Sequence, residues 1–427
     1  MAKADPVQAF LHFGYLPDDS SDPLAFLGDS QGWSIQKRNL AGKSLSFLVE
    51  LGVERLKTAF SETMVGGNGR IHVLPLSGGL DSRAILGGLL ENVGSHQIQT
   101  VTYGSPGAWD YELGRRVAQA AGVPHQAVDL TAVSWHWSAA DILATAVQVA
   151  KPVWLIDTYI NHHILKRYGA ESSYWSGFMG DPLAGSHLLP EDSASWSEAR
   201  RRFVTRNRYT RSVALTSSHY DPVAIMPGQP WLQPELLTYD EQLDFGLRQR
   251  CLIRHIITLP GYACRMPFLH SEWVAFMLGT PREYRAGQFL YKKILQAAYP
   301  HLFSLPTKTN KGLPLDAPSW RQQMQRIRLQ ARAGFRRLLP RSIRPARPNV
   351  NYIDFNGGLR RRADLKSFVH EHIQQLKGRD LVKWVDIDKL WRQHQQGGAN
   401  YAPELLLLAY LDIYLSAGKL AQHVAEI

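Results

Sequence analysis

The sequence has little cysteine and no long uninterrupted apolar run. Only Cys251 and Cys264 occur in 427 residues, which excludes a disulfide framework and a site built from several thiolates, and indicates a reducing compartment. The two most apolar stretches are interrupted by Asp141 and Asp412, so neither predicts a membrane-spanning helix. The N-terminal sequence Met-Ala-Lys-Ala-Asp-Pro also lacks the apolar core of an export signal. We therefore expect a soluble, cytoplasmic protein without a membrane among its partners.

Charged residues are also sparse, at 20% of the chain against 44% hydrophobic residues, which excludes a disordered or coiled-coil protein. The charge that is present is unbalanced: 48 Lys and Arg against 37 Asp and Glu give 48 − 37 = +11. This excess is compatible with anionic partners such as nucleotide phosphates or nucleic acid, but a charge total cannot choose between them. At roughly 150 residues per domain, the length favours two or three domains.

Apolar periodicity alternates between strand and helix after the first 66 residues. Such alternation predicts β-α-β units and a parallel sheet, which place ligands at the carboxyl ends of the strands. The expected fold class is α/β with a helical C-terminal part. The expected strands are 71–76, 98–103, 125–130 and 173–176; the expected helices are 82–91, 111–121, 139–150 and 157–168, with further helical patterns over 244–278 and 367–421.

We divide the chain into three parts. Residues 1–66 form a short N-terminal preamble. Residues 67–320 form the main unit, in which the Trp- and Pro-rich stretch 190–240 is expected to be an irregular insertion. Residues 321–427 hold an arginine-rich segment followed by C-terminal helices that pack on the main unit.

The most informative stretch lies between the first expected strand and its helix, and reads Leu76-Ser77-Gly78-Gly79-Leu80-Asp81-Ser82. Glycines and serines in a tight strand-to-helix turn let backbone N–H groups converge on one anion, and the helix N-terminus adds its positive dipole end. No lysine stands at the spacing of a Walker loop, and the dinucleotide fingerprint is absent. Asp81 would repel a bare phosphate, so we interpret it as a Mg²⁺ ligand.

This turn resembles the pyrophosphate loop of the ATP pyrophosphatase superfamily, the PP-loop, which cleaves ATP between its α and β phosphates. Four further stretches extend the resemblance: Ser-Gly-Phe-Met-Gly-Asp-Pro-Leu-Ala-Gly at 176–185, Arg-Met-Pro-Phe-Leu at 265–269, Tyr-Lys-Lys-Ile-Leu at 291–295, and Pro-Thr-Lys-Thr-Asn-Lys-Gly-Leu-Pro at 306–314. In this order and spacing, over roughly residues 45–420, the chain is similar to the synthetase domain of asparagine synthetase. Relatives of that domain include β-lactam synthetases and lasso-peptide macrolactam cyclases.

The resemblance implies a nucleotide site. The residues that would hold the pyrophosphate are Ser77, Gly78, Gly79, Asp81 and Ser82. The residues that would contact the rest of the nucleotide are Leu76 and Tyr103, flanking the adenine, and Ser176 and Gly177, through their backbone.

The resemblance also implies the catalytic groups. Asp81 and Asp181 would ligate Mg²⁺, and a lysine of the late loop would neutralise charge that develops on the α-phosphate and the leaving group. Lys308 is the first choice for that lysine and Lys311 the second.

These groups predict an ATP- and Mg²⁺-dependent amide synthetase. A substrate carboxylate attacks the α-phosphorus, pyrophosphate leaves, and an amine or ammonia then attacks the acyl-adenylate and expels AMP. Such chemistry needs mainly positioning and charge neutralisation, which oriented N–H groups, a metal ion and a lysine supply. A peptide, another natural product or a sugar acid are all open as the carboxylate substrate.

The chain departs from the asparagine synthetase pattern at several positions. Those enzymes carry a glutaminase whose nucleophilic cysteine follows the initiator methionine, and here that residue is Ala2. We expect the nitrogen to come from free ammonia, from a substrate amine, or through a separate glutaminase or recognition protein docked on the preamble. Phe178 and Pro182 stand where glutamates are usual, and Lys151 where an acidic residue is usual, which disfavours plain asparagine synthesis. An enlarged apolar pocket near Phe178 and Trp154 would suit a bulkier substrate.

Other candidate residues have plainer interpretations. Arg265 is equally well explained as a structural cation and as a clamp for a substrate carboxylate. Asp110 and Glu112 are expected to cap their helix. Three histidines without partners at ligand spacing are expected on helix surfaces or in the core rather than at a metal: His162, His163 and His255.

The arginine-rich segment 326–362 leaves nucleic acid open as a partner, but with few aromatic residues among its arginines and prolines it is a poor base-stacking platform. We expect a solvated face there, and nucleic acid is the disfavoured partner. Two alternatives to the amide synthetase therefore remain: a PP-loop enzyme that modifies tRNA, and a nucleotide-binding scaffold without turnover.

Overall fold

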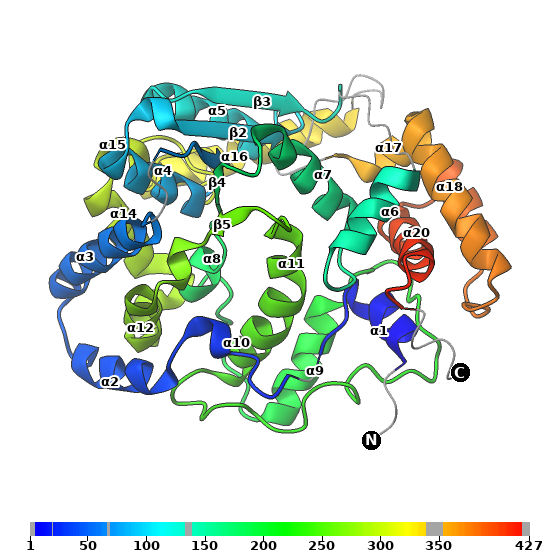
Figure 1. Ribbon diagram of the computed structural model, residues 1–427, viewed down its shortest axis with the longest axis horizontal. Helices are drawn as coiled ribbons and strands as arrows, with labels where there is room; N and C mark the ends of the chain where they lie inside the picture. The colour runs from blue at the N-terminus through cyan, green and yellow to red at the C-terminus, as the bar shows by residue number, and fades with distance from the viewer. Residues whose placement is uncertain (1–4, 19, 66–68, 133–138, 339–352, 421–427) are drawn as a thin grey trace.

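The computed structural model describes residues 5–18, 20–65, 69–132, 139–338 and 353–420. Its centre is a five-stranded, fully parallel sheet with the strand order β3-β2-β1-β4-β5 (Figure 1). This confirms the predicted α/β class and the four predicted strands. The strands are β1 (His72–Pro75), β2 (Ile98–Gly104), β3 (His125–Asp129), β4 (Ser173–Trp175) and β5 (Ala263–Arg265).

The fifth strand was not predicted, because residues 244–278 were expected to be helical throughout. β5 has only three residues, too few to show the alternation of apolar and polar positions that marks a strand in a sequence. The preceding helix ends at Ile257, and Gly261, with a φ of 80°, lies in the turn that leads into β5. Its backbone pairs with β4, where Ser173 is opposite Ala263. Pairing across the sheet, rather than local pattern, therefore makes this segment a strand.

Helices cover both faces of the sheet. The side chains of Val73 and Val101 enter one apolar core, whereas Leu74 and Ile98 enter a second core on the opposite face. This follows from the alternation of side chains along a strand. The helices of the crossover connections are α4 (Asp81–Asn92), α5 (Trp109–Ala121), α6 (Ala139–Gln148), α7 (Leu155–Leu165) and the short α8 (Gly180–Leu183).

The N-terminal residues are integrated into these cores. Phe10 of α1 (Pro6–Phe13) is buried, and its ring packs edge-on against Tyr414 of α20 (Ala402–Ser416) at 5.6 Å between centroids. The following helices α2 (Ser30–Leu40) and α3 (Leu45–Thr63) contribute to the second core, on the face of the sheet that α4 covers.

The stretch 190–240 contains a helix that the sequence analysis did not predict. α9 (Trp196–Asn207) begins at Ser195, whose hydroxyl accepts a hydrogen bond from the N–H of Glu198, and it buries Ala199 and Phe203. The prediction of an irregular insertion is therefore wrong for these residues, although no helix or strand is found in the described residues from 208 to 238. Five of the 12 residues of α9 are basic or acidic, which obscured its narrow apolar stripe in the sequence.

Beyond the insertion the chain is mostly helical. The helices up to the late loop are α10 (Tyr239–Leu243), a π-helical segment (Asp244–Ile253), α11 (Arg254–Ile257), α12 (Ser271–Gly279), α13 (Arg282–Arg285), α14 (Phe289–Ala298) and α15 (Pro300–Phe303). Those of the C-terminal part are α16 (Ser319–Leu338), α17 (Phe355–Arg361), α18 (Ala363–Gly378), α19 (Ile387–Gln395) and α20.

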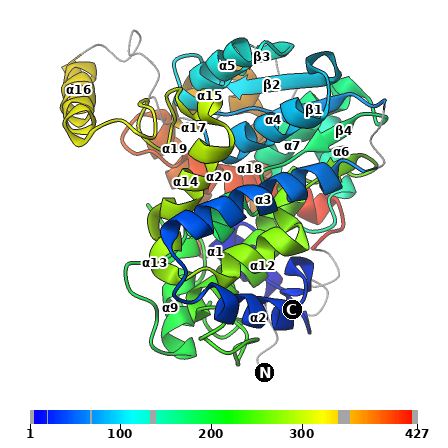
Figure 2. The same cartoon turned by 90° about the vertical axis from the view of Figure 1, so that its left-hand side faces the viewer.

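The C-terminal part confirms the predicted helical pattern. α16 stands away from the body of the molecule, whereas α18 and α20 lie against it (Figure 2). Residues 339–352 of the arginine-rich segment lie outside the described residues. None of the helices in the described ranges combines the length and the apolarity that crossing a membrane requires.

Candidate functional site

The glycine-rich turn predicted to bind phosphate connects β1 to α4, at the carboxyl edge of the sheet. Its three successive N–H groups are all held by side-chain oxygens. Ser77 N donates to Ser82 Oγ (3.1 Å), Gly78 N to Asp110 Oδ1 (3.2 Å) and Gly79 N to Ser77 Oγ (3.2 Å). The N–H groups of the turn thus donate to side-chain oxygens, and phosphate oxygens are acceptors of the same kind.

The N-terminus of α4 adds further donors to this turn. Leu80 precedes the helix and provides no side-chain cap. The first intrahelical bond runs from Ala84 N to Leu80 O (2.9 Å), so the N–H groups of Asp81, Ser82 and Arg83 have no partner within the helix. A helix of 12 residues places the positive end of its dipole here.

An open pocket lies beside the turn, between the carboxyl ends of β1 and β2. Its volume is about 140 Å³, smaller than the roughly 300–1,000 Å³ of most small-molecule sites, so it would hold only part of a nucleotide. Its walls include Leu76 and Tyr103, the two residues expected to flank an adenine. The Tyr103 hydroxyl donates to Asn161 Oδ1 (3.0 Å), which fixes the ring from its far end. The geometry therefore brings the expected adenine contacts and the expected phosphate turn to the same edge of the sheet.

The two predicted metal ligands, Asp81 and Asp181, lie together. Asp81 Oδ2 accepts a hydrogen bond from the backbone N–H of Asp181 (2.9 Å), and Asp81 Oδ1 accepts one from the Tyr291 hydroxyl (2.8 Å). The carboxylate of Asp181 is oriented by Gln288, whose Nε2 donates to Oδ1 (2.6 Å). Burial raises the pKa of Asp81 well above its usual value, and the nearby negative charge of Asp181 raises it further.

Glycines allow β4 and α8 to approach Asp81 this closely. A Cβ on Gly180 would lie 2.4 Å from Asp81 Cγ, and one on Gly177 would lie 2.7 Å from Asp81 Cβ. Gly177 was expected to contact the nucleotide through its backbone, as was Ser176. In this structure Ser176 N donates to Arg265 O (2.9 Å), and its hydroxyl accepts from Phe178 N (3.2 Å). Both residues therefore lie in the turn that also positions Asp181.

The carboxylate pair fits a divalent cation. Two carboxylates in close proximity, one of them with a raised pKa, repel each other until a cation or a proton neutralises them. Mg²⁺ typically takes one or two protein carboxylates and completes its shell with phosphate oxygens and water. Across the described residues there is no cluster of three or more His, Cys, Asp or Glu side chains at metal-binding spacing. The site accordingly suits a metal ion that arrives with a phosphate ligand better than a resident structural metal.

The late loop brings Lys308, rather than Lys311, to the glycine-rich turn. Lys308 N donates to Gly78 O (2.8 Å), and Lys308 Nζ forms an ion pair with Asp110 Oδ2 (2.5 Å). Lys311 is exposed, has a φ of 53°, and its carbonyl accepts a hydrogen bond from Gln325 Nε2 (2.9 Å). Lys308, the first choice for the catalytic lysine, therefore lies beside the glycine-rich turn, whereas Lys311 does not.

Backbone strain is concentrated around these contacts. Of the four described non-glycine residues with positive φ, three belong to this region: Met179 (67°) next to α8, Gln288 (61°) and Lys311. Left-handed conformations cost free energy in side-chain-bearing residues, and they persist where the surrounding structure enforces them, commonly at functional sites.

Asp110 is a site residue that the sequence analysis misassigned. It was expected to cap its helix, but the residue at the N-cap of α5 is Ala108, and Asp110 bonds to Gly78 N and to Lys308 Nζ instead. Tyr291 and Gln288 were not selected either. Tyr291 lies within the Tyr-Lys-Lys stretch that carried the resemblance, which was a usable signal, whereas nothing in the sequence marks Gln288 as a partner of Asp181.

Arg265 is structural rather than free to clamp a substrate. Its guanidinium donates to the carbonyls of Thr63 (3.1 Å) and Val65 (3.3 Å) at the C-terminal end of α3, where a cation also complements the helix dipole. His162 is buried in the core, as expected, and its Nε2 contacts Thr258 O (3.1 Å).

The residues that depart from the asparagine synthetase pattern are all engaged elsewhere in the fold. Phe178 is buried against Phe26, at 6.1 Å between ring centroids. Lys151 forms an ion pair with Asp18. Trp154 packs edge-on against Tyr209, at 5.5 Å between centroids, and so lies in a different cluster from Phe178. The two aromatic side chains therefore do not line one common apolar pocket.

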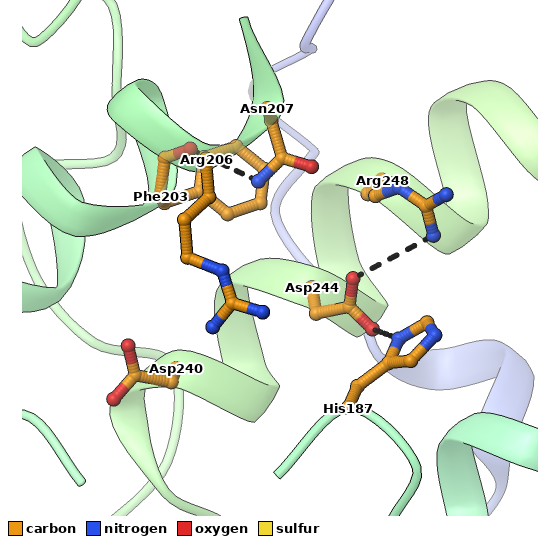
Figure 3. Close-up of a pocket in the computed structure, with 7 residues that line it drawn as sticks. All are labelled: His187, Phe203, Arg206, Asn207, Asp240, Asp244 and Arg248. Atoms are coloured by element: carbon orange, nitrogen blue, oxygen red, sulfur yellow. Dashed lines mark hydrogen bonds and ion pairs between the residues drawn. The ribbon is translucent and has the colours of Figure 1, made fainter. Parts of the chain in front are cut away.

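A second pocket lies between α9 and α10 and has a volume of about 250 Å³ (Figure 3). Asp244 accepts from His187 Nδ1 (2.7 Å) and pairs with Arg248 (4.0 Å), while Asp240 is held by Ser193 N (2.8 Å). In Figure 3 the guanidinium of Arg206 points from α9 toward these two carboxylates. Within the described ranges Arg206 itself forms no ion pair. The pocket therefore combines two arginines with two aspartates, and Arg206 faces the aspartates without a direct ion pair.

This second pocket is connected to the carboxylate pair through buried contacts. Arg285 donates to the carbonyl of Leu183 in α8 (3.0 Å) and to Glu241 Oε1 in α10 (2.6 Å). Both members of the Arg285–Glu241 pair are buried, so breaking it would leave an uncompensated charge. α8, which carries Asp181, is thereby fixed to the helix that forms one wall of the pocket.

Fold and site together define an α/β protein with a parallel sheet and a turn that presents oxygen-binding donors beside two carboxylates and a lysine. No model of a known protein family matches the chain, and no curated protein matches it either.

Proposed function

We propose that this protein is an ATP-dependent amide synthetase of the asparagine synthetase-like type, which forms an acyl-adenylate and releases AMP and pyrophosphate. The observation that carries the proposal is the convergence of three elements from distant parts of the sequence on one edge of the sheet. These are the turn at 77–82, the Asp81–Asp181 pair and Lys308. We also propose that the sheet and its helices form a PP-loop ATP pyrophosphatase domain.

In this proposal, the phosphates of ATP replace the side chains that now hold the turn. Gly78 N and Lys308 Nζ share the carboxylate of Asp110, which occupies the two donors that a pyrophosphate would need. Entry of the nucleotide frees both donors toward phosphate oxygens, since Asp110 and the phosphates repel each other. Leu76 and Tyr103 then line the wall against which the adenine lies.

Asp81 and Asp181 would hold Mg²⁺ together with the phosphates, and the ion would supply neutralisation of the charge on the pyrophosphate as it leaves. Tyr291 and Gln288 keep the two carboxylates in their orientation. Lys308 lies where its ammonium can stabilise charge that develops between the α-phosphate and the leaving group. The substrate carboxylate attacks the α-phosphorus, and the amine that follows expels AMP from the adenylate.

The pocket of Figure 3 supports a role in substrate recognition. Arg206 and Arg248 offer guanidinium groups in this hollow, whose volume suits a small charged group rather than a whole drug-sized molecule. We assign to them the recognition of an anionic group on the carboxylate or amine substrate, away from the bond that forms, because guanidinium groups bind carboxylates through two parallel hydrogen bonds.

The proposal is tested by following the fate of ATP. Purified protein with Mg²⁺, ATP labelled at the α-phosphate and a pool of carboxylic acids should produce AMP and pyrophosphate, and mass spectrometry should identify the carboxylate trapped as its adenylate when no amine is given. ADP and phosphate as products would contradict the proposal. AMP release that depends on added tRNA would favour a tRNA-modifying enzyme, and nucleotide binding without turnover would favour a scaffold.

Paired lysine variants sharpen this test. Lys308→Met should lower the rate of pyrophosphate release by about 100-fold or more, as removal of a group that stabilises transition-state charge does. The matched change Lys311→Met, in the same loop but at an exposed position, should alter the rate by no more than about threefold. Equal losses in the two variants would show that the loop, and not the Lys308 ammonium, matters.

A further inference from the structure

α16 combines strong positive charge with an exposed apolar stripe. Its 20 residues contain six arginines and neither aspartate nor glutamate. Its large apolar side chains face water: Trp320 is 61% exposed, Met324 48%, Ile327 52% and Phe335 64%. Large exposed side chains of this kind are individually common, but a contiguous set on one helix marks an interaction surface.

The exposed apolar residues lie on one face of the helix. At about 100° per residue, Trp320, Met324, Ile327 and Phe335 fall within an arc of roughly 80°. Arg321, Arg328 and Arg332 follow along one flank of this stripe, and Arg326 lies on the other side by the same count. The sequence analysis expected a uniformly solvated face here; the structure instead shows an amphipathic helix with its apolar side uncovered.

The helix projects from the body of the protein, so the stripe is accessible along its length (Figure 2). Its described link to the body comes from the N-terminal half, where Gln325 Nε2 donates to the carbonyl of Lys311 (2.9 Å).

The combination of charge and apolar surface selects one kind of partner. A nucleic-acid duplex would neutralise the arginines but leave the apolar stripe in water, since its phosphate backbone offers no apolar contact. The bases of a single strand would stack on Trp320 and Phe335 but leave Met324 and Ile327 uncovered. An anionic lipid bilayer satisfies both halves: the headgroups attract the arginines, and the acyl boundary accepts the apolar side chains. A basic helix with Trp and Phe on its apolar side is the usual form of a helix that lies in the plane of such a surface.

We propose that α16 binds the surface of an anionic membrane, lying parallel to it, and so makes this protein a peripheral membrane protein. The stripe Trp320–Phe335 enters the headgroup region and the flanking arginines pair with lipid phosphates. The proposal is independent of the function proposed above. It nevertheless places the loop that carries Lys308 next to the membrane, because α16 follows that loop and is bonded to it through Gln325.

The experiment is co-sedimentation of the full-length protein with lipid vesicles. Vesicles of phosphatidylcholine mixed with phosphatidylglycerol should retain the protein, whereas vesicles of phosphatidylcholine alone should not. Binding should weaken at high salt, because the arginines contribute through screened charge. Equal retention on neutral and anionic vesicles, or no retention on either, would overturn the proposal.

Surface variants separate the contribution of the apolar stripe to membrane binding from that of the arginines. The pair Trp320→Ser and Ile327→Ser should weaken binding to anionic vesicles by about tenfold or more, as should Arg321→Gln with Arg328→Gln. The control Phe47→Ser removes an aromatic residue of α3 that is 42% exposed, and it should leave binding unchanged. Each variant's circular dichroism and unfolding midpoint confirm that it is folded, and Ile327→Asp provides a second, single-site readout.

The same variants would reveal a partner of α16 other than a membrane. If the arginine double variant lost RNA binding while the apolar double variant bound vesicles like the wild type, nucleic acid would be the partner. If the wild type were dimeric and that variant monomeric, the stripe would instead be covered by a second copy of the chain. Either result would refute membrane attachment through α16.

Discussion

At the scale of single residues, the candidate site is centred on Asp81, whose surroundings disfavour its ionised form. Asp81 is withdrawn from water, faces Asp181, and is restrained by Tyr291 and by a backbone N–H. The ionised carboxylate thus lowers the stability of the fold unless a cation or a proton neutralises it. Such destabilising groups are common at functional sites and rare among structural residues.

This arrangement predicts opposite effects of one substitution on stability and on activity. Because the folded-state pKa of Asp81 is raised, its ionised form destabilises the fold, and that cost grows as pH rises through the raised pKa. Asp81→Asn should therefore raise the unfolding temperature of the nucleotide-free protein by about 1–3 °C at neutral pH and lower turnover by about 100-fold or more. Differential scanning calorimetry and pyrophosphate release measure the two effects.

A control for this prediction is a carboxylate whose pKa is shifted in the opposite direction. Hydrogen bonds from Lys377 and Gln374 lower the pKa of Asp388, an exposed residue of α19, so its ionised form is favoured in the fold. Asp388→Asn should slightly lower the unfolding temperature and leave turnover unchanged. If Asp81→Asn also lowered the unfolding temperature, or kept its rate, the assigned role of the pair would be wrong.

At the scale of elements, the position of α4 decides where the phosphate turn points. α4 lies close to α3 and to the end of α14 because two of its residues lack side chains. A Cβ on Gly88 would lie 2.4 Å from Phe60 Cδ2, and one on Gly87 would lie 2.6 Å from the ring of Tyr299. These contacts involve buried aromatic rings in the second core, which cannot move aside without opening cavities.

Gly88→Ala is therefore expected to destabilise the fold although alanine favours helices. Overpacking of this kind costs about 1–3 kcal/mol, more than the helix propensity gained. The matched control is Gly378→Ala in α18, where an added Cβ would meet nothing within 4 Å; it should be neutral or stabilise by up to about 1 kcal/mol. Urea unfolding of both variants measures the difference, and two equally stable variants would contradict the packing argument.

At the scale of the whole molecule, apolar cores on the two faces of the sheet enclose histidines that are neutral when folded. Burial lowers the pKa of His162 to about 4, and of His394 to about 4. Within the described residues, His162 Nδ1 has no hydrogen-bond partner and His394 Nδ1 accepts from Tyr401 N (3.0 Å). A proton on either ring would place an N–H where no acceptor lies, or would break an existing bond.

Acidification should therefore destabilise the protein well above the pH at which most carboxylates titrate. The unfolded chain binds protons at these histidines from about pH 6.5 downward while the folded chain does not, so each costs up to about 1 kcal/mol of stability per pH unit. Asp157, whose pKa burial raises to about 6, works in the opposite direction and offsets part of the loss. Urea midpoints at pH 7.5, 6.5 and 5.5 measure the slope. His162→Gln should flatten it and His96→Gln, at an exposed site, should not.

The sequence by itself determined the sheet, most of its helices and the chemical content of the site. Apolar periodicity is a local property, so β1 to β4 and the helices between them could be located without knowledge of their neighbours. The turn at 77–82 was recognisable because glycines, serines and one aspartate in a strand-to-helix turn have few other uses. Lys308 and Asp181 were implied by the resemblance of their stretches to the synthetase domain of asparagine synthetase.

The tertiary structure alone decided how distant segments meet. β5 is a strand because β4 lies beside it, α9 forms because its narrow stripe finds a core, and Asp110 contacts Gly78 and Lys308 instead of capping its own helix. The same holds for Gln288 beside Asp181 and for the uncovered stripe of α16. In each case the free energy comes from contacts between residues far apart in the chain, which no local window of sequence contains.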